Sequence, residues 1–414
     1  MIRTKQSDAQ QVKAKPPRAK APPGAELPFE VAVVQLAKSV DESYRGSPCY
    51  QAWRLLKADR LEGSDLLSSE AQSIFEGLYR ADPDEPLALH HLAIIHHGRA
   101  IQQHLAGQGA EPAACADWRK GLQAWADLLS NERFWESLRG RWQTKLQRFP
   151  HDRLLERLLQ LTNFAAIRSR LPAQLLRLHV DIIVESLQRQ KASVAKAHFA
   201  LLCGAPLPAN VVAETRKSLY QEIVGDTSCK DNQYADTRQR IENYLMLESD
   251  SAKALTASVR LALSEAESHL RDQAPERAWQ AIEKARPHAE HPALRAAQQG
   301  AEGANLRNLL RDYFFKGAFA ALHTAQSFAD NNVSRALTLF EKSYAFSEQA
   351  IAHGQSVESL EKLRDVLCED AAYAAIGNDN FTEAHRFIDR GLSGKPNDPL
   401  LLRMRALSFK RQGN

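Results

Sequence analysis

Long apolar runs and paired cysteines are both missing from this sequence of 414 residues. Arginines interrupt even the most apolar stretch, residues 154–183, whereas a membrane-spanning helix needs about 20 consecutive apolar residues. We therefore predict no membrane contact. The five cysteines are odd in number and widely scattered, which is typical of reduced thiols and unlike a disulfide or zinc framework. The sequence thus favours a cytoplasmic location.

Glycine and proline are sparse too, at 19 and 18 residues, so we expect most of the chain to fold. The exception is residues 1–28, where five prolines, four of them at positions 16, 17, 22 and 23, stand among lysine, alanine and glutamine. Little apolar surface is available there to offset the entropy of ordering the chain. We predict a disordered basic arm over residues 1–28.

Alternating strand patterns are also missing. From Pro28 onward apolar residues recur three and four positions apart, and short breakers such as 83–86 and 396–399 separate the periodic segments. The sequence therefore predicts an all-α protein made of short to medium helices. Breakers at this spacing favour helical hairpins over one long coiled coil.

One pattern of residues occurs twice, near the two ends of the chain. It starts with a small residue and continues with residues of the same helix face four and seven positions later. A proline follows twelve positions after the first residue. In both copies a second proline follows after two more residues, where the next helix is expected to start. The copies are Ala71, Phe75, Leu78 and Pro83, and Ala384, Ile388, Gly391 and Pro396.

This pattern resembles the second helix of the tetratricopeptide repeat (TPR). The segment after Pro86 supports the resemblance, because Leu89 and Ala93 stand where the family has its large and small residues. Weaker copies lie at 278–285 and 336–340. The resemblance implies a TPR-like α-solenoid of stacked antiparallel helical hairpins, and a function in protein binding.

These patterns predict three folded segments after the arm. They are an N-terminal TPR-like module at 29–150, a basic helical middle region at 151–260 and C-terminal TPR-like repeats at 261–414. In the N-terminal module the second-helix pattern starts at Gly121 and not near residue 105, which predicts an inserted loop near 101–116. Such an insertion is either part of a binding face or a tolerated surface loop.

Four histidines crowd the helix predicted after Pro86, at positions 90, 91, 96 and 97. No two of them are four residues apart, so the spacing of a helical zinc site is missing, and we expect no metal and no cofactor. In the repeat register His90 and His97 fall on the side that lines the groove, and Arg99 follows closely. We predict that these three side chains contact the ligand.

Four tryptophans follow in two pairs with a spacing of seven: Trp118, Trp125, Trp135 and Trp142. Aromatic residues at helical spacing are expected in the core, and an exposed binding platform is the alternative. Three arginines nearby are candidates for a cationic rim to such a platform: Arg133, Arg139 and Arg141.

The repeat register also assigns groove-facing positions near the C-terminal end, at Val366, Glu369 and Tyr373. Some TPR proteins grip a terminal carboxylate through Lys, Asn and Arg at such positions. Because the residues here are of other types, the sequence predicts a different ligand.

Catalytic signatures are missing: there is no phosphate-binding loop, dinucleotide fingerprint, nucleophile elbow or Cys-x-x-Cys. We therefore predict a non-enzymatic adaptor or scaffold that binds a peptide or partner protein. Residues 139–200 carry twelve Lys and Arg against four acids. With the basic arm, this stretch supports an alternative, a nucleic-acid-associated protein. An enzyme without a recognisable motif is the second alternative.

Overall fold

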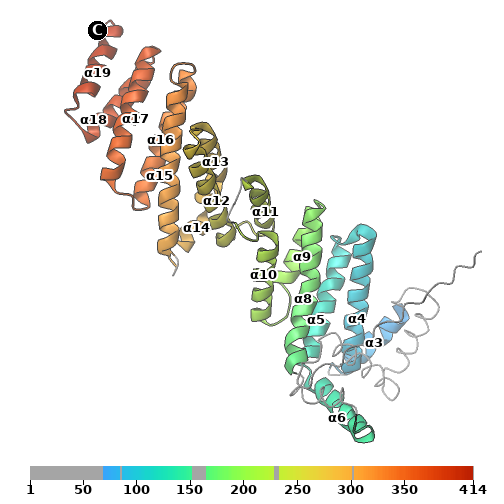
Figure 1. Ribbon diagram of the computed structural model, residues 1–414. Coiled ribbons are helices and arrows are strands. Elements are labelled where there is room, and N and C mark those ends of the chain that lie inside the picture. Colours follow the sequence, from blue (N-terminus) through green and yellow to red (C-terminus); the bar gives the residue numbers. More distant parts are fainter. Residues whose placement is uncertain (1–68, 84–85, 152–164, 228–232, 301–302, 414) are drawn as a thin grey trace, which may run out of the picture. The chain divides into compact units, whose positions relative to one another are not determined.

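The computed structural model describes residues 69–83, 86–151, 165–227, 233–300 and 303–413. Every regular element in these ranges is a helix (Figure 1), which confirms the all-α prediction for them. None of the helices described there is long and apolar enough to cross a bilayer. The predicted arm, 1–28, lies outside the described residues.

The chain divides into two compact units, 1–175 with 205–208, and 176–204 with 209–414. Helix α8 (Ala165–Gln188) contains the boundary between them. The three folded segments expected from the sequence stay a prediction. The other described helices of the first unit are α3 (Ser69–Ala81), α4 (Pro86–Gln103), the π-helical turn η2 (His104–Gln108), α5 (Pro112–Ser130) and α6 (Glu132–Arg148).

Helix α4 is the centre of the first unit, where it contacts α3, α5 and α6. Phe75 of α3 and Trp118 of α5 are fully buried in this packing. The segment 101–116, predicted to be an inserted loop, is mostly helical, and that prediction is corrected. Helix α4 continues into η2, the chain turns near Gly107 at a φ of 84°, and α5 starts at Pro112. Gly107 and Pro112 are so close together that only a short turn separates η2 from α5.

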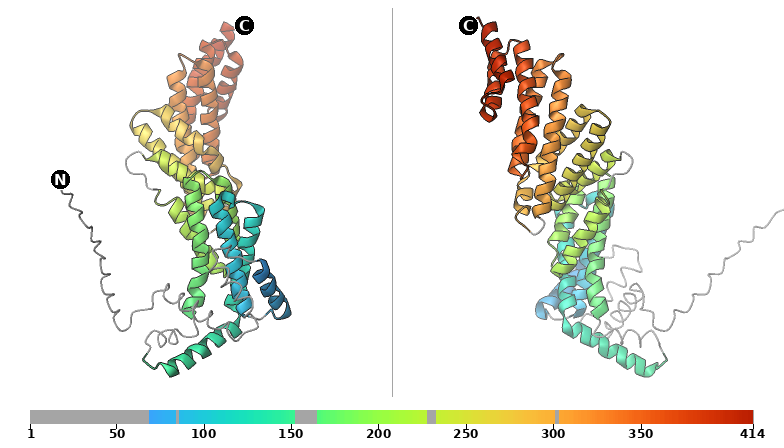
Figure 2. Two further views of the ribbon diagram at one scale, coloured as in Figure 1. Left: turned by 90° about the vertical axis from the view of Figure 1, so that its right-hand side faces the viewer. Right: turned by 60° about the vertical axis from the view of Figure 1, so that its left-hand side comes forward.

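The second unit is a succession of helices in which neighbours along the chain pack together (Figures 1 and 2). After α8 its helices are α9 (Ala192–Cys203), α10 (Ala209–Ile223), α11 (Tyr234–Leu247), α12 (Ala252–Arg271), α13 (Pro275–Ala289), α14 (Pro292–Ala297), α15 (Gly303–Phe328), α16 (Val333–Ala352), α17 (Val357–Gly377), α18 (Phe381–Gly394) and α19 (Pro399–Arg411).

Three helix pairs dominate the packing of this unit: α12 with α13, α15 with α16, and α17 with α18. Helix α15 also contacts both members of the preceding pair, and so does α17, while α19 contacts α17 and α18. Each new pair is therefore joined to the one before it through its first helix.

Local sequence sets where these helices begin. The side chains of Asn332 and Asn380 accept hydrogen bonds from backbone N–H groups in the first turns of α16 and α18. Asp398 does the same for α19, which starts with Pro399. The two prolines predicted to separate helices, Pro83 and Pro396, do lie between α3 and α4 and between α18 and α19.

Small residues allow the helices of the second unit to approach closely. A Cβ atom added to Gly317 of α15 would lie 2.4 Å from the ring of Phe346 on α16. Ala384 and Ile388, which belong to the repeated pattern, are fully buried on α18. These placements fit the face predicted from the pattern, whereas the assignment to the TPR family stays a prediction.

Polar side chains link the first helices of the pairs to one another, and the second helices likewise. Lys316 of α15 lies 3.9 Å from Glu267 of α12, and Gln326 of α15 donates a 2.7 Å hydrogen bond to Asp370 of α17. On the second helices the ion pairs include Glu283 with Lys342 and Glu341 with Arg390, both at 2.6 Å. The first helices α12, α15 and α17 are thus direct neighbours along one side.

Candidate functional site

Three of the four histidines of α4 contact α5, whereas His91 packs against Phe75 of α3 at 4.7 Å between ring centroids. His90 is buried, and its ring stands edge-on to Trp125 at 5.8 Å. His97 lies 5.2 Å from the ring of Trp118, and its Nδ1 accepts a 3.1 Å hydrogen bond from Trp125 Nε1. The structure therefore brings His90 and His97 together around Trp125, within the contact between the two helices.

His97 is uncharged at neutral pH. Burial, together with the neighbouring charge of His96, lowers the pKa of His97 to about 4. His96 itself is held by Asp117 of α5, at 2.9 Å between Nδ1 and Oδ1. Gly121 leaves room for the His97 ring, because a Cβ atom at that position would lie 2.4 Å from it. These contacts give His97 a packing role, and its contact with a ligand stays a prediction.

The four predicted arginines lie on two helices, Arg99 on α4 and the other three on α6. Arg99 is half-buried on α4, and Arg133 on α6 makes an exposed 3.4 Å ion pair with Asp82. Arg139 is exposed on α6, and the side chain of Arg141 lies outside the described part. A cationic rim formed by Arg133, Arg139 and Arg141 stays a prediction.

The tryptophans lie mainly in the core, as expected from their spacing. Trp118 and Trp135 are buried, and Trp125 is half-buried against His97. The side chain of Trp142 lies outside the described part. An exposed platform is therefore ruled out for Trp118 and Trp135.

A more open candidate surface lies on α17, at the groove-facing positions expected from the sequence. Tyr373 is 71% exposed and Val366 is 40% exposed, and they stand seven residues apart on one side of the helix. The opposite side carries Leu367, Cys368 and Ala371, which are buried. Val366 and Tyr373 therefore lie near the middle of the one side of α17 that no other described helix covers.

The neighbouring helix α15 extends this apolar surface. Phe319 is 39% exposed and packs edge-on against His323, at 4.2 Å between ring centroids. Gln326 follows on the same side of α15 and donates the hydrogen bond to Asp370 of α17. We call the surface formed by Phe319, His323, Val366, Glu369 and Tyr373 the α15–α17 face.

Carboxylates border the α15–α17 face. Burial raises the pKa of Glu369, and the negative charges of Asp398, Asp365 and Asp370 raise it further. Lys395 opposes that shift, but its ammonium group is bonded to Asp365. The field around Glu369 is therefore negative, and a cation brought to this face would be attracted.

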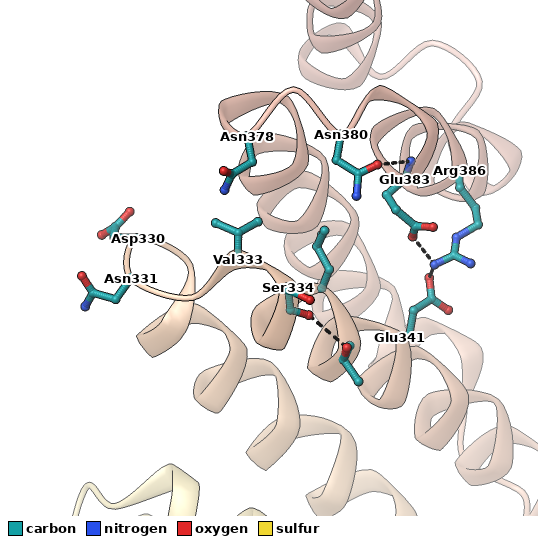
Figure 3. A pocket seen from close by; sticks show the side chains of 11 residues that line it. Asp330, Asn331, Val333, Ser334, Glu341, Asn378, Asn380, Glu383 and Arg386 are labelled. Carbon is teal, nitrogen blue, oxygen red and sulfur yellow. Dashed lines mark hydrogen bonds and ion pairs between the residues drawn. The ribbon is translucent and has the colours of Figure 1, made fainter.

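A polar cleft of about 610 Å³ opens beside the starts of α16 and α18 (Figure 3). Three asparagines and several hydroxyl and carboxylate groups line it, and Arg386 bridges Glu341 and Glu383 at its edge. Asn380 is engaged in capping α18. Arg386 thus offsets part of the charge of these two carboxylates and links α16 to α18.

Nucleophiles and metal ligands are not assembled in the described ranges. No group of three or more His, Cys, Asp or Glu side chains is placed there to hold a metal ion. Burial raises the pKa of the Cys203 thiol, and it raises that of Cys368 to about 11. These two thiols are protonated at neutral pH and are therefore weak nucleophiles.

Comparison with known proteins adds no relative to this picture. No protein-family model matches the chain, and no curated protein matches it.

Proposed function

We propose that the chain is a TPR-like helical-repeat adaptor that holds a segment of a partner protein on the α15–α17 face, and that it acts by binding and not by catalysis. The exposure of Tyr373 and Val366 carries this proposal. A large aromatic and a branched aliphatic side chain in the middle of an uncovered helix side are typical of a protein-binding surface.

The packing of the second unit supports the repeat part of the proposal. Between α12 and α19, first helices contact first helices, and ion pairs link second helices to one another. A TPR array has such neighbour relations, and its binding surface is lined by first helices. Phe319 and Tyr373 lie on the first helices α15 and α17.

The chemistry of the face defines the partner segment. Its apolar centre requires aliphatic or aromatic side chains, and the carboxylates around Glu369 require Lys or Arg. We therefore expect a basic amphipathic segment, either extended or helical.

The double variant Val366→Ser/Tyr373→Ser tests the proposal. A photo-crosslinking amino acid at position 373 of the full chain first identifies the partner in the native cell, and calorimetry with that purified partner gives the affinity. Burying a side chain of this size contributes about 1.5–3 kcal/mol, so partial coverage of the two predicts an affinity loss of about tenfold or more.

The matched control is Leu402→Ser/Leu407→Ser on α19, since these leucines are 42% and 44% exposed but lie outside the face. This control is expected to bind as the unchanged chain does. Equal affinity for both double variants would overturn the assignment of the face. Recovery of nucleic acid alone, lost on nuclease treatment, would overturn the adaptor proposal itself.

The nucleic-acid alternative receives less support from the described residues. Arg177 is bonded to Asp181 and Glu222, and Arg189 pairs with Glu185. Cations that already face carboxylates are poor phosphate ligands. Both residues belong to the basic stretch 139–200 from which this alternative was inferred.

A further inference from the structure

A cavity of about 660 Å³ lies among α10, α12 and α15, away from the α15–α17 face. Tyr220 of α10, Ala257 of α12 and Leu306 of α15 give it apolar walls. Polar side chains occupy the rest of its lining. The ones used below are Asp226, Lys253, Thr256, Arg260 and Asn305.

Two cations of α12 converge on this cavity. The Lys253 ammonium group lies 4.0 Å from the centre of the Tyr220 ring, in a cation–π contact. Burial raises the pKa of the Tyr220 hydroxyl, and the positive charge of Arg260 opposes that shift. Lys253 and Arg260 thus lie close to the same ring, whose hydroxyl is uncharged at neutral pH.

Within the described ranges the two cations have no acidic partner, unlike two arginines of neighbouring helices. Arg216 is bonded to Glu248 and Arg238 to Glu265. Among the residues that the structure describes, no carboxylate pairs with Lys253 or Arg260. On α12 itself, the positions four and three residues before Arg260 hold Thr256 and Ala257, which carry no charge.

The charge around the cavity is therefore positive. Asp226 is the one carboxylate among its described lining residues, against the two cations. Like charges held near each other repel, and an anion placed between them removes that cost. Thr256 and Asn305 add a hydroxyl and a side-chain amide, which donate hydrogen bonds to anionic oxygens.

We propose that this cavity binds an anionic group, a carboxylate or a phosphate, carried by an organic molecule. Lys253 and Arg260 supply the charge, Thr256 and Asn305 donate hydrogen bonds, and the walls at Tyr220 and Leu306 cover the apolar part of the ligand. This site does not depend on the function proposed for the α15–α17 face, because the two share no residue.

Calorimetry on the full chain, at one fixed ionic strength, tests the site with two probes, inorganic pyrophosphate and citrate. The unchanged chain is expected to bind one or both, and the probe it prefers separates phosphate from carboxylate recognition. The variant Lys253→Gln/Arg260→Gln is expected to bind at least about tenfold more weakly, since two charge-assisted hydrogen bonds are lost.

Helix α13 provides the matched control, Arg277→Gln/Lys284→Gln. These residues are exposed, seven positions apart and outside the cavity lining, so the net charge changes equally. The control is expected to keep the affinity of the unchanged chain within about twofold. Equal weakening in both double variants, or no binding of either probe by the unchanged chain, would overturn the site. Thermal melting, followed by circular dichroism, checks that each variant folds. If the double variant is unfolded, the single variant Arg260→Gln replaces it, because Arg260 is exposed.

Discussion

Tyr313 of α15 donates a hydrogen bond of 2.6 Å from its phenol to the carbonyl oxygen of Ile282 on α13. Both residues are fully buried. Burial raises the pKa of Tyr313 far above its ordinary value, so the phenol is protonated and donates a hydrogen bond at neutral pH. This bond fixes the first helix of one pair to the second helix of the pair before it.

The substitution Tyr313→Phe is expected to lower the free energy of unfolding by about 1 kcal/mol, because it removes one buried hydrogen bond and leaves the ring in place. Urea unfolding followed by circular dichroism measures the change. The control is Tyr344→Phe, whose hydroxyl has no hydrogen-bond partner in the described part of the chain and whose ring contacts with Arg364 and Arg390 are kept. An equal loss in both variants would contradict the assigned role of the Tyr313 bond.

At Gly317 of α15, even the methyl group of alanine is expected to be too large for the packing. Its Cβ position lies 2.4 Å from Phe346 and 3.0 Å from Ile282, so Gly317→Ala requires the helices to separate or the ring to move. We expect a loss of about 1–3 kcal/mol of unfolding free energy.

Gly377, the last residue of α17, provides the matched comparison because no atom lies within 4 Å of its Cβ position. Alanine is favoured over glycine in a helix by up to about 1 kcal/mol, so Gly377→Ala is expected to leave stability unchanged or raise it. Thermal denaturation of the two variants distinguishes the outcomes. A neutral Gly317→Ala would mean that α15 and α16 are not in such close contact.

Asp398 sets the start of α19. Its side chain accepts hydrogen bonds from the backbone N–H groups of Leu400 and Leu401, at 2.9 and 3.1 Å. The substitution Asp398→Ala is expected to destabilise this helix by about 1 kcal/mol, while Asp398→Asn keeps an acceptor and most of the stability. Hydrogen exchange of the Leu400 and Leu401 amides measures the effect locally. Unchanged exchange in the alanine variant would exclude a capping role.

The sequence predicted best the features that depend on a few adjacent residues. The prolines at 83 and 396 separate helices as expected, since proline at those positions removes a backbone donor and prevents the helix from continuing. The exposure of Val366 and Tyr373 agrees with the side of the helix that the repeat register assigned to them. Both are local properties.

Features that depend on residues distant in the chain were not predicted. His90 and His97 have the spacing of a groove face, but α5 covers them, because Trp125 and Gly121 form a surface that fits their rings. The pairing of Lys253 with a ring on another helix was likewise missed. Its sequence signal is two cations seven residues apart without an acid three or four residues from Arg260.

Acid is expected to weaken the contact between α4 and α5. Burial and the charge of His96 lower the pKa of His97 from 6.5 to about 4 in the folded chain. Unfolding exposes the ring and restores its ordinary pKa, so between these values the unfolded chain binds a proton that the folded chain does not. The stabilisation from neutral His97 is therefore complete above pH 6.5 and is lost as the pH falls toward 4.

Within that pH window, the free energy of unfolding is expected to fall by up to about 1.4 kcal/mol per pH unit. Urea unfolding at pH 7 and pH 5, followed by tryptophan fluorescence, measures it in the first unit, where Trp118 and Trp125 contact His97. His288 and His353, whose pKa values are lowered by burial, belong to the second unit and are less visible to this probe. The variant His97→Gln is expected to be less stable at pH 7 but to lose less between pH 7 and pH 5. A variant that loses as much as the unchanged chain would show that another group causes the acid sensitivity.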